Sequence, residues 1–177
     1  MTYDVFALFA TDSKAEEKGR AFTEEFGGGA TFRIARSGNR EYTSQLQAEY
    51  KAHEYTLAQG NKKDASEAEK AAAEALSTQI VGRIMARTIL LGWDTNETQE
   101  DGSVKVIEDQ ISFNGEILPY SIANAEKLLG LKEFRARINA ISGNYEKFLV
   151  QQQEDDAKNS APISTGTSSG ETTSSSS

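Results

Sequence analysis

The chain has 177 residues, of which 37% are hydrophobic, and its formal net charge is −8. Its length fits one domain, and the acidic excess argues against a general nucleic-acid binder or a protein that docks on anionic membranes, because both need basic surfaces. The absence of cysteine excludes disulfides, thiolate catalysis and cysteine metal sites.

The first third of the chain predicts short elements separated by turns. Tyr3 to Phe9 is short and aromatic, which favours a strand or a docking segment. Lys14 to Phe26 has apolar residues at helical spacing, and the run Gly27-Gly28-Gly29 should end that helix. A phosphate-binding loop would follow a strand and open a helix, so we interpret these glycines as a break. Thr31 to Ala35 alternates apolar and polar side chains and predicts a strand.

Arg36-Ser37-Gly38-Asn39 has the composition of a turn, and the residues that follow it, Arg40 to Gln59, predict a helix. The apolar stripe of this helix is formed by Tyr42, Leu46, Tyr50 and Leu57. We interpret the stripe as a packing surface, because no basic groove accompanies it as in an aromatic nucleic-acid platform.

The longest apolar-periodic segment, STQIVGRIMARTILLGW, runs from Ser77 to Trp93. It predicts a helix to Leu91 that Gly92 ends, followed by a buried Trp93. Ala65 to Leu76 is either a separate solvent-facing helix or the front of the same helix. We expect the central helix to build the core. The expected core residues are Ile80, Ile84, Leu91, Trp93, Phe134 and Ile138.

The last third predicts a loop, a hairpin and two helices. Asp94 to Lys105 is acidic and only loosely imitates a calcium loop, so we expect a solvated loop. Asn114-Gly115, between alternating apolar residues of Gln110 to Tyr120, predicts a hairpin. Ser121 to Leu129 predicts a capped helix, and Leu131 to Val150 predicts a helix that packs on the central one.

The expected fold class is therefore mainly α: a small helical domain over residues 1–150 with a short β-hairpin and strand element. Residues 151–177 are polar and rich in serine and threonine, and they predict a disordered tail, since they cannot bury enough apolar area. No segment is apolar enough for a membrane span and no signal peptide is visible, so we expect a cytoplasmic protein.

The sequence offers no catalytic constellation. His53 is the only histidine, and a metal site or a catalytic base would need partners for it, so we expect a surface histidine. The carboxylates lie on polar faces and in loops, where charges are usually solvated. We expect no cofactor, no metal and no enzyme activity, and we interpret the protein as a binder.

Several segments in order resemble the tail assembly chaperones of long-tailed, siphovirus-type bacteriophages. They are GATFRIARSGNREY, RTILLGWD, LPYSIANAEKLL and EFRARINAISGNYEKFL, between about Gly29 and Val150. The matching motif residues are Phe32, Arg36, Gly38, Asn39, Leu90, Leu91, Gly92, Trp93, Gly102, Pro119, Tyr120, Ser121, Asn124 and Ala125. The first two dozen residues and the tail are not part of the resemblance.

The resemblance implies a protein of the host cell cytoplasm that is absent from the mature virion. It would coat and solubilise the helical tape measure protein, associate along it and help to recruit the major tail tube protein. We expect the contact surface on the two helices Arg40–Gln59 and Leu131–Val150. The candidate partner-binding residues are Arg33, Arg36, Asn39, Tyr42, Leu46, Tyr50, Tyr145 and Phe148. The alternatives are ordinary surface salt bridges for the two arginines, and a structural virion part or an enzyme with dispersed carboxylates for the whole chain.

Overall fold

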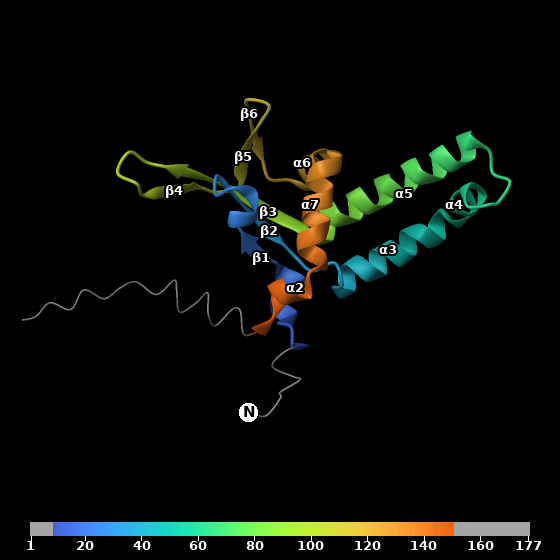
Figure 1. The fold of residues 1–177 in the computed structure, drawn as a ribbon, viewed down its shortest axis with the longest axis horizontal. Helices are drawn as coiled ribbons and strands as arrows, with labels where there is room; N and C mark the ends of the chain where they lie inside the picture. The colour runs from blue at the N-terminus through green and yellow to red at the C-terminus, as the bar shows by residue number, and fades with distance from the viewer. Residues whose placement is uncertain (1–8, 151–177) are drawn as a thin grey trace, which may run out of the picture.

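The computed structural model describes residues 9–150, which form an α/β fold with a helical arm (Figure 1). The helices are α2 (Ser13–Lys18), α3 (Arg40–Ala52), α4 (Glu54–Gly60), α5 (Glu67–Thr88), α6 (Ile122–Leu129) and α7 (Lys132–Gly143), with short 3-10 helices η1 (Glu24–Phe26) and η2 (Tyr145–Phe148). The strands are β1 (Arg20–Phe22), β2 (Ala30–Ile34), β3 (Leu90–Thr98), β4 (Val104–Ile107), β5 (Gln110–Phe113) and β6 (Glu116–Pro119).

The main sheet is antiparallel, in the order β1-β2-β3-β4. Its longest strand, β3, pairs with β2 through its first half and with β4 through its second half. Phe32 lies opposite Trp93 in the β2–β3 register, and both side chains are buried. The second half of β3 and all of β4 extend away from the body as a hairpin (Figure 1).

The core lies on one face of the main sheet. Trp93 is 1% exposed, its Nε1 donates to the carbonyl oxygen of Leu118 at 3.1 Å, and its ring meets Tyr120 edge to face at 5.0 Å. The β5–β6 hairpin therefore packs beside β3. Further core residues come from the C-terminal half of α5, from α6 and α7, from Phe148 of η2, and from Ala15 of α2 and Phe22 of β1.

The arm consists of α3 and α4 lying side by side with α5 (Figure 1). Ser66 caps α5: its side chain accepts from the backbone N–H of Glu69, while the Glu69 carboxylate accepts from the N–H of Ser66. The C-terminal half of α5 enters the core, whereas in its N-terminal half only Ala73 is buried, and α3 and α4 contain no buried residue. The helices of the arm therefore bury few side chains between them.

The expectation of a mainly α fold is wrong, because the described residues are 54% helical and 22% strand. The central helix ends at Thr88 and not at Leu91. The last residues of the expected helix and the expected acidic loop, Asp94 to Lys105, belong to strands β3 and β4 and the turn between them. The run Ile89 to Trp93 is continuously apolar, a pattern that a buried strand and a buried helix share. Beyond it, residues 94–98 are polar on both faces, so the second half of β3 lacks the alternation that marks a strand.

The expected helix over Lys14–Phe26 is also wrong. Asp12 caps α2, whose last residue is Lys18, and Gly19 follows it with φ +75°. A β-carbon on Gly19 would lie 3.0 Å from the backbone of Ile34, so only glycine lets the chain turn here so close to β2. The residues after Gly19 form β1 and η1.

The expected helix over Leu131–Val150 is shorter than predicted. It ends at Gly143, and Asn144 then caps η2 through its side chain. α7 packs mainly on α6 and β2 and not, as expected, on the central helix, whose main helical neighbours are α6, α4 and α3. The predictions of strand β2, of the Asn114-Gly115 hairpin and of helix α6 are confirmed, and Asn114 and Gly115 have the positive φ values of that turn.

The predictions for residues 1–8 and 151–177 lie outside the described residues. Within 9–150, no helix is long and apolar enough to cross a bilayer.

Candidate functional site

The outer half of the arm carries a groove between α4 and α5. Two adjoining hollows, of about 560 and 540 Å³, share Tyr50, Leu57 and Asn61 in their walls. The remaining walls of the first hollow are formed by residues of α3 and α4, and the second hollow also has walls formed by residues of α5. The other lining residues are Lys51, Glu54 and Ala58 for the first, and Gly60, Lys70, Ala73, Glu74, Ser77 and Thr78 for the second. We call this surface the arm groove.

The walls of the arm groove are fixed by two contacts between its helices. The hydroxyls of Tyr50 and Ser77 share a hydrogen bond of 2.9 Å. Nearer the end of the arm, Gly60 lies so close to Ala73 that a β-carbon on residue 60 would overlap the Ala73 side chain. The absence of a side chain at Gly60 therefore allows the close approach of α4 to α5.

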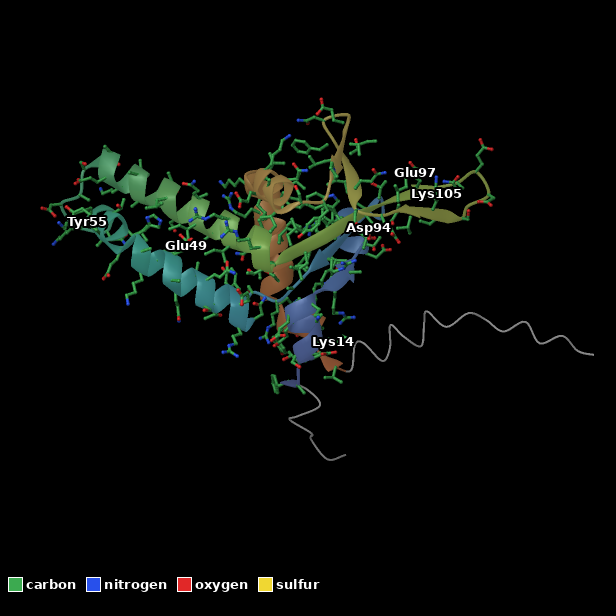
Figure 2. The ribbon with its side chains drawn as sticks, turned by 180° about the vertical axis from the view of Figure 1, so that it is seen from behind. Lys14, Glu49, Tyr55, Asp94, Glu97 and Lys105 are labelled. Atoms are coloured by element: carbon green, nitrogen blue, oxygen red, sulfur yellow. The ribbon has the colours of Figure 1, made fainter. Side chains whose placement is uncertain are left out.

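A charged cluster ties the middle of the arm together at the break between α3 and α4. The Glu49 carboxylate accepts from Arg83 of α5 at 2.6 Å, and its oxygen lies 3.6 Å from Nε2 of His53. His53 stands between the two helices and has left the helical conformation. The cluster therefore joins α5 to the point where the backbone bends between α3 and α4. Figure 2 labels Glu49 at this place on the arm.

Asn39 anchors the base of the arm. Its side-chain oxygen caps α3 by accepting from the N–H of Tyr42 at 2.8 Å. Its amide nitrogen donates to the carbonyl oxygens of Arg36 and Thr88 at 2.7 and 3.2 Å. One side chain thus joins the start of α3 to the last turn of α5, which sets the position of the arm on the body.

The arm groove has an apolar floor and a charged rim. Tyr50 and Leu57 are half-buried and Ala73 is buried, while Lys51, Glu54, Lys70 and Glu74 are exposed at its sides. The hollows are shallow and mix both signs of charge. Such a surface suits the apolar stripe of a helix better than a small molecule, which usually binds in an enclosed cavity with convergent polar groups.

Two smaller hollows flank the base of the arm. One includes Arg40, Arg87 and Leu91, and the other includes Arg83, Arg135 and Glu126. Acidic side chains lie beside the arginines in both. Over residues 9–150, no group of three or more histidine, aspartate or glutamate side chains is placed to hold a metal ion.

The structure separates the candidate partner-binding residues. Tyr50, Leu46 and Tyr42 are half-buried on the arm helix α3. Tyr42 packs against the core, and burial, followed by the nearby Tyr50, raises the pKa of its phenol. At the other end of the chain, Tyr145 stacks on Phe9 with ring centroids 6.0 Å apart, and neither residue lines the arm groove.

Two of the candidates are buried in the folded protein and offer a partner little or no side-chain surface. Asn39 is 4% exposed and serves as the cap described above, and Phe148 is fully buried in the core. Arg36 forms an ion pair with Glu16 and is also bonded to Thr11, while Arg33 is exposed on β2 and covers Gly92.

Most of the expected core residues are buried. Ile80, Ile84, Trp93 and Ile138 are at most 1% exposed. Leu91 is only half-buried, because it faces the hollow beside Arg87 at the arm base. Phe134 is half-buried too, with its ring 5.4 Å from that of Phe32.

Sequence reasoning missed the contribution of α5 to the groove. Gly60 and Ala73 are small residues in polar segments, and Ser77 is a polar residue at the start of the apolar segment, so nothing in their spacing marks them as an interface. The sequence feature that does indicate the groove is the apolar stripe of the predicted helix Arg40 to Gln59, because its residues Tyr50 and Leu57 line both hollows.

No protein family, no curated protein and no solved structure matches this chain.

Proposed function

We propose that the protein is a tail assembly chaperone of a long-tailed bacteriophage, which binds the tape measure protein through the arm groove. The observation that carries the proposal is an arm of three helices, α3, α4 and α5, with an open apolar groove. The segments that resemble the chaperone family supply the identity of the partner, and the groove supplies a surface on which a helix fits.

A helix from the partner would pack along the groove between α4 and α5 and add a further helix to the arm. Its apolar stripe would cover Tyr50, Leu57 and Ala73, and its polar flanks would meet the charged rim of Lys51, Glu54, Lys70 and Glu74. The floor is small, so each copy would bind weakly. Many copies along one long helical partner would nevertheless cover it, and tail tube subunits could displace them one by one.

The charge of the chain supports a solubilising role. Free tape measure helices expose apolar stripes, and large exposed apolar surfaces promote aggregation. A chain of net charge −8 adds repulsion to each helix that it covers. The protein would act in the host cytoplasm, associate along the tape measure protein, present it to tail tube protein and leave before the virion is complete.

The second candidate is a structural component of the virion tail or connector. The observation that favours it is the four-stranded sheet with open edges, since tail proteins assemble largely through sheets. Mass spectrometry of purified particles separates the two functions. Abundant copies in the virion would support the structural component, and their absence would support the chaperone.

Co-expression with the tape measure protein of the same phage tests the proposal. We expect the tape measure protein to become soluble and to co-purify with this protein. A Leu57→Lys variant should lose both effects, because a charge replaces the apolar floor, whereas Tyr55→Lys on the exposed side of the same helix should keep them. A tape measure protein that stays insoluble in the presence of the parent protein would refute the proposal.

A further inference from the structure

The β3–β4 hairpin ends in a strand whose outer edge is open. β4 is the last strand of the main sheet, and no strand among residues 9–150 pairs with its free side. The hairpin extends beyond the body, so no helix or loop of the described part of the chain covers this edge (Figure 1). Open edges expose backbone N–H and C=O groups that can pair with another chain.

The hydrogen-bond alternation identifies which groups of β4 are free. The N–H of Gln99 donates to the carbonyl of Ser103 at 2.8 Å, and the register then places Glu97 opposite Lys105 and Asn96 opposite Val106. In an antiparallel pair, hydrogen-bonded and non-bonded residue pairs alternate. Lys105 and Ile107 therefore bond to β3, while the backbone groups of Val104 and Val106 face outward.

The same two residues present the largest apolar surface of the hairpin. Val104 and Val106 are 59% and 54% exposed, and they lie on one face because their positions differ by two. Lys105, the basic residue of this strand, projects from the opposite face, beside Glu97 (Figure 2). One stretch thus combines open backbone groups with two exposed valines.

Acidic residues flank this edge at both ends. Glu100 and Asp101 lie in the turn before β4, and Glu108 and Asp109 follow it. Within 9–150, none of the four forms an ion pair with a lysine or arginine; Asp101 instead accepts from Ser103 and its pKa is lowered by those bonds. The field at the edge of β4 is therefore negative.

We propose that β4 captures an extended, basic segment of a partner protein as a fifth strand of the main sheet. The backbone of Val104 and Val106 would supply the hydrogen bonds, their side chains would pack on alternate apolar residues, and the flanking carboxylates would attract alternate lysines or arginines. This surface is separate from the arm groove, and the inference does not depend on the proposed function.

The charges also argue against a second copy as the occupant. Two β4 strands paired in antiparallel orientation would place the turn acids Glu100 and Asp101 of one copy beside Glu108 and Asp109 of the other. Opposed like charges destabilise strand pairing. A basic segment removes this repulsion, so it fits the edge better than β4 of another molecule.

The test uses the full chain and a seven-residue probe peptide that alternates lysine and valine. NMR titration should show binding, with slowed amide exchange at Val104 and Val106. An alternating glutamate–valine peptide should not bind, and a lysine–valine peptide with N-methylated backbone amides should bind at least about tenfold more weakly, a loss of about 1.4 kcal/mol. Val106→Pro should cause a similar loss, because it removes an outward N–H and leaves the β3–β4 bonds in place.

The matched control is Val106→Thr, which keeps the β-branched shape and the backbone N–H and should retain most of the affinity. Replacement of the four flanking acids by their amides should weaken binding and flatten its dependence on salt. Equal binding of the N-methylated peptide, no protection at Val104 and Val106, or self-association through β4 in sedimentation would each overturn the proposal.

Discussion

Gly60 of α4 lies against Ala73 of α5, so close that a β-carbon at position 60 would overlap the alanine side chain and lie 2.9 Å from the carbonyl oxygen of Glu69. This contact closes the outer end of the arm. It also forms one wall of the arm groove, since both residues line the hollow shared by the two helices.

Gly60→Ala should therefore open the end of the arm. Overpacking of this kind costs about 1–3 kcal/mol, and the loss should stay local, because the core is remote from the contact. Hydrogen exchange should become faster in Glu54–Gly60 and in the first turns of α5, and should stay unchanged around Trp93. Gly82→Ala is the matched control: an added β-carbon there meets no atom of residues 9–150 within 4 Å, and the helix should gain about 0.5–1 kcal/mol. Unchanged exchange in Gly60→Ala would contradict the close contact.

Asn39→Ala should loosen the base of the arm. The substitution removes the cap of α3 and leaves the carbonyl oxygen of Thr88 without the amide that it accepts from. Loss of the cap alone costs about 1–2 kcal/mol, measurable by urea unfolding. Ser44→Ala on the exposed side of α3 should stay within about 0.5 kcal/mol of the parent, and equal stability of the two variants would contradict the anchoring role of Asn39.

Trp93→Ala should destabilise the whole body by about 3–5 kcal/mol. The indole is buried at the meeting point of β3 and the β5–β6 hairpin, and it donates to Leu118. Trp93→Phe keeps much of the packing and should cost less. Chemical unfolding measures both variants. A Trp93→Ala protein that unfolds like the parent but loses its partner would show that the indole belongs to a binding surface.

Stability should fall in acid partly through Glu25. Burial raises the pKa of its carboxyl, but the bond from Lys147, whose Nζ lies 2.6 Å away, acts together with a backbone hydrogen bond and the positive charges of Lys147 and Arg137. Together they outweigh burial, and the pKa falls below its usual 4.5. The folded state then binds the proton less readily than the unfolded chain does, so this stabilisation is complete above the ordinary pKa and disappears as the pH falls through the lowered value.

NMR titration of the Glu25 carboxyl carbon measures this pKa directly. Lys147→Met should raise the pKa of Glu25, because the burial then acts without the ammonium. Lys14→Met, at an exposed lysine of α2 labelled in Figure 2, should leave it unchanged. A pKa of Glu25 that does not respond to Lys147→Met would contradict the pairing.

The elements with strong local signals could be predicted from the sequence. Asn114-Gly115 requires positive φ at both positions, and Ser121 caps α6 in the way that its place before an apolar run indicates. The alternation of Thr31 to Ala35 likewise marks β2. In each case the residues near one another in the chain determine the conformation.

The remaining elements depend on contacts between distant residues. Leu90 and Trp93 would be equally suitable in a buried helix and in a buried strand. Their pairing with Ile34 and Phe32 of β2 selects the strand. The arm groove depends on Gly60 and Ala73, whose small side chains carry no periodic signal. Phe148 looked like part of an exposed stripe because the expected helix did not end at Gly143.

The most direct test of the account is the footprint of a tape measure helix on this protein, measured by hydrogen exchange with mass spectrometry. We expect slower exchange in residues 50–61 and 70–78, which include the lining of the arm groove, and no such protection when Leu57→Lys replaces the parent. Protection confined to residues outside the arm, or equal protection in the Leu57→Lys variant, would contradict it.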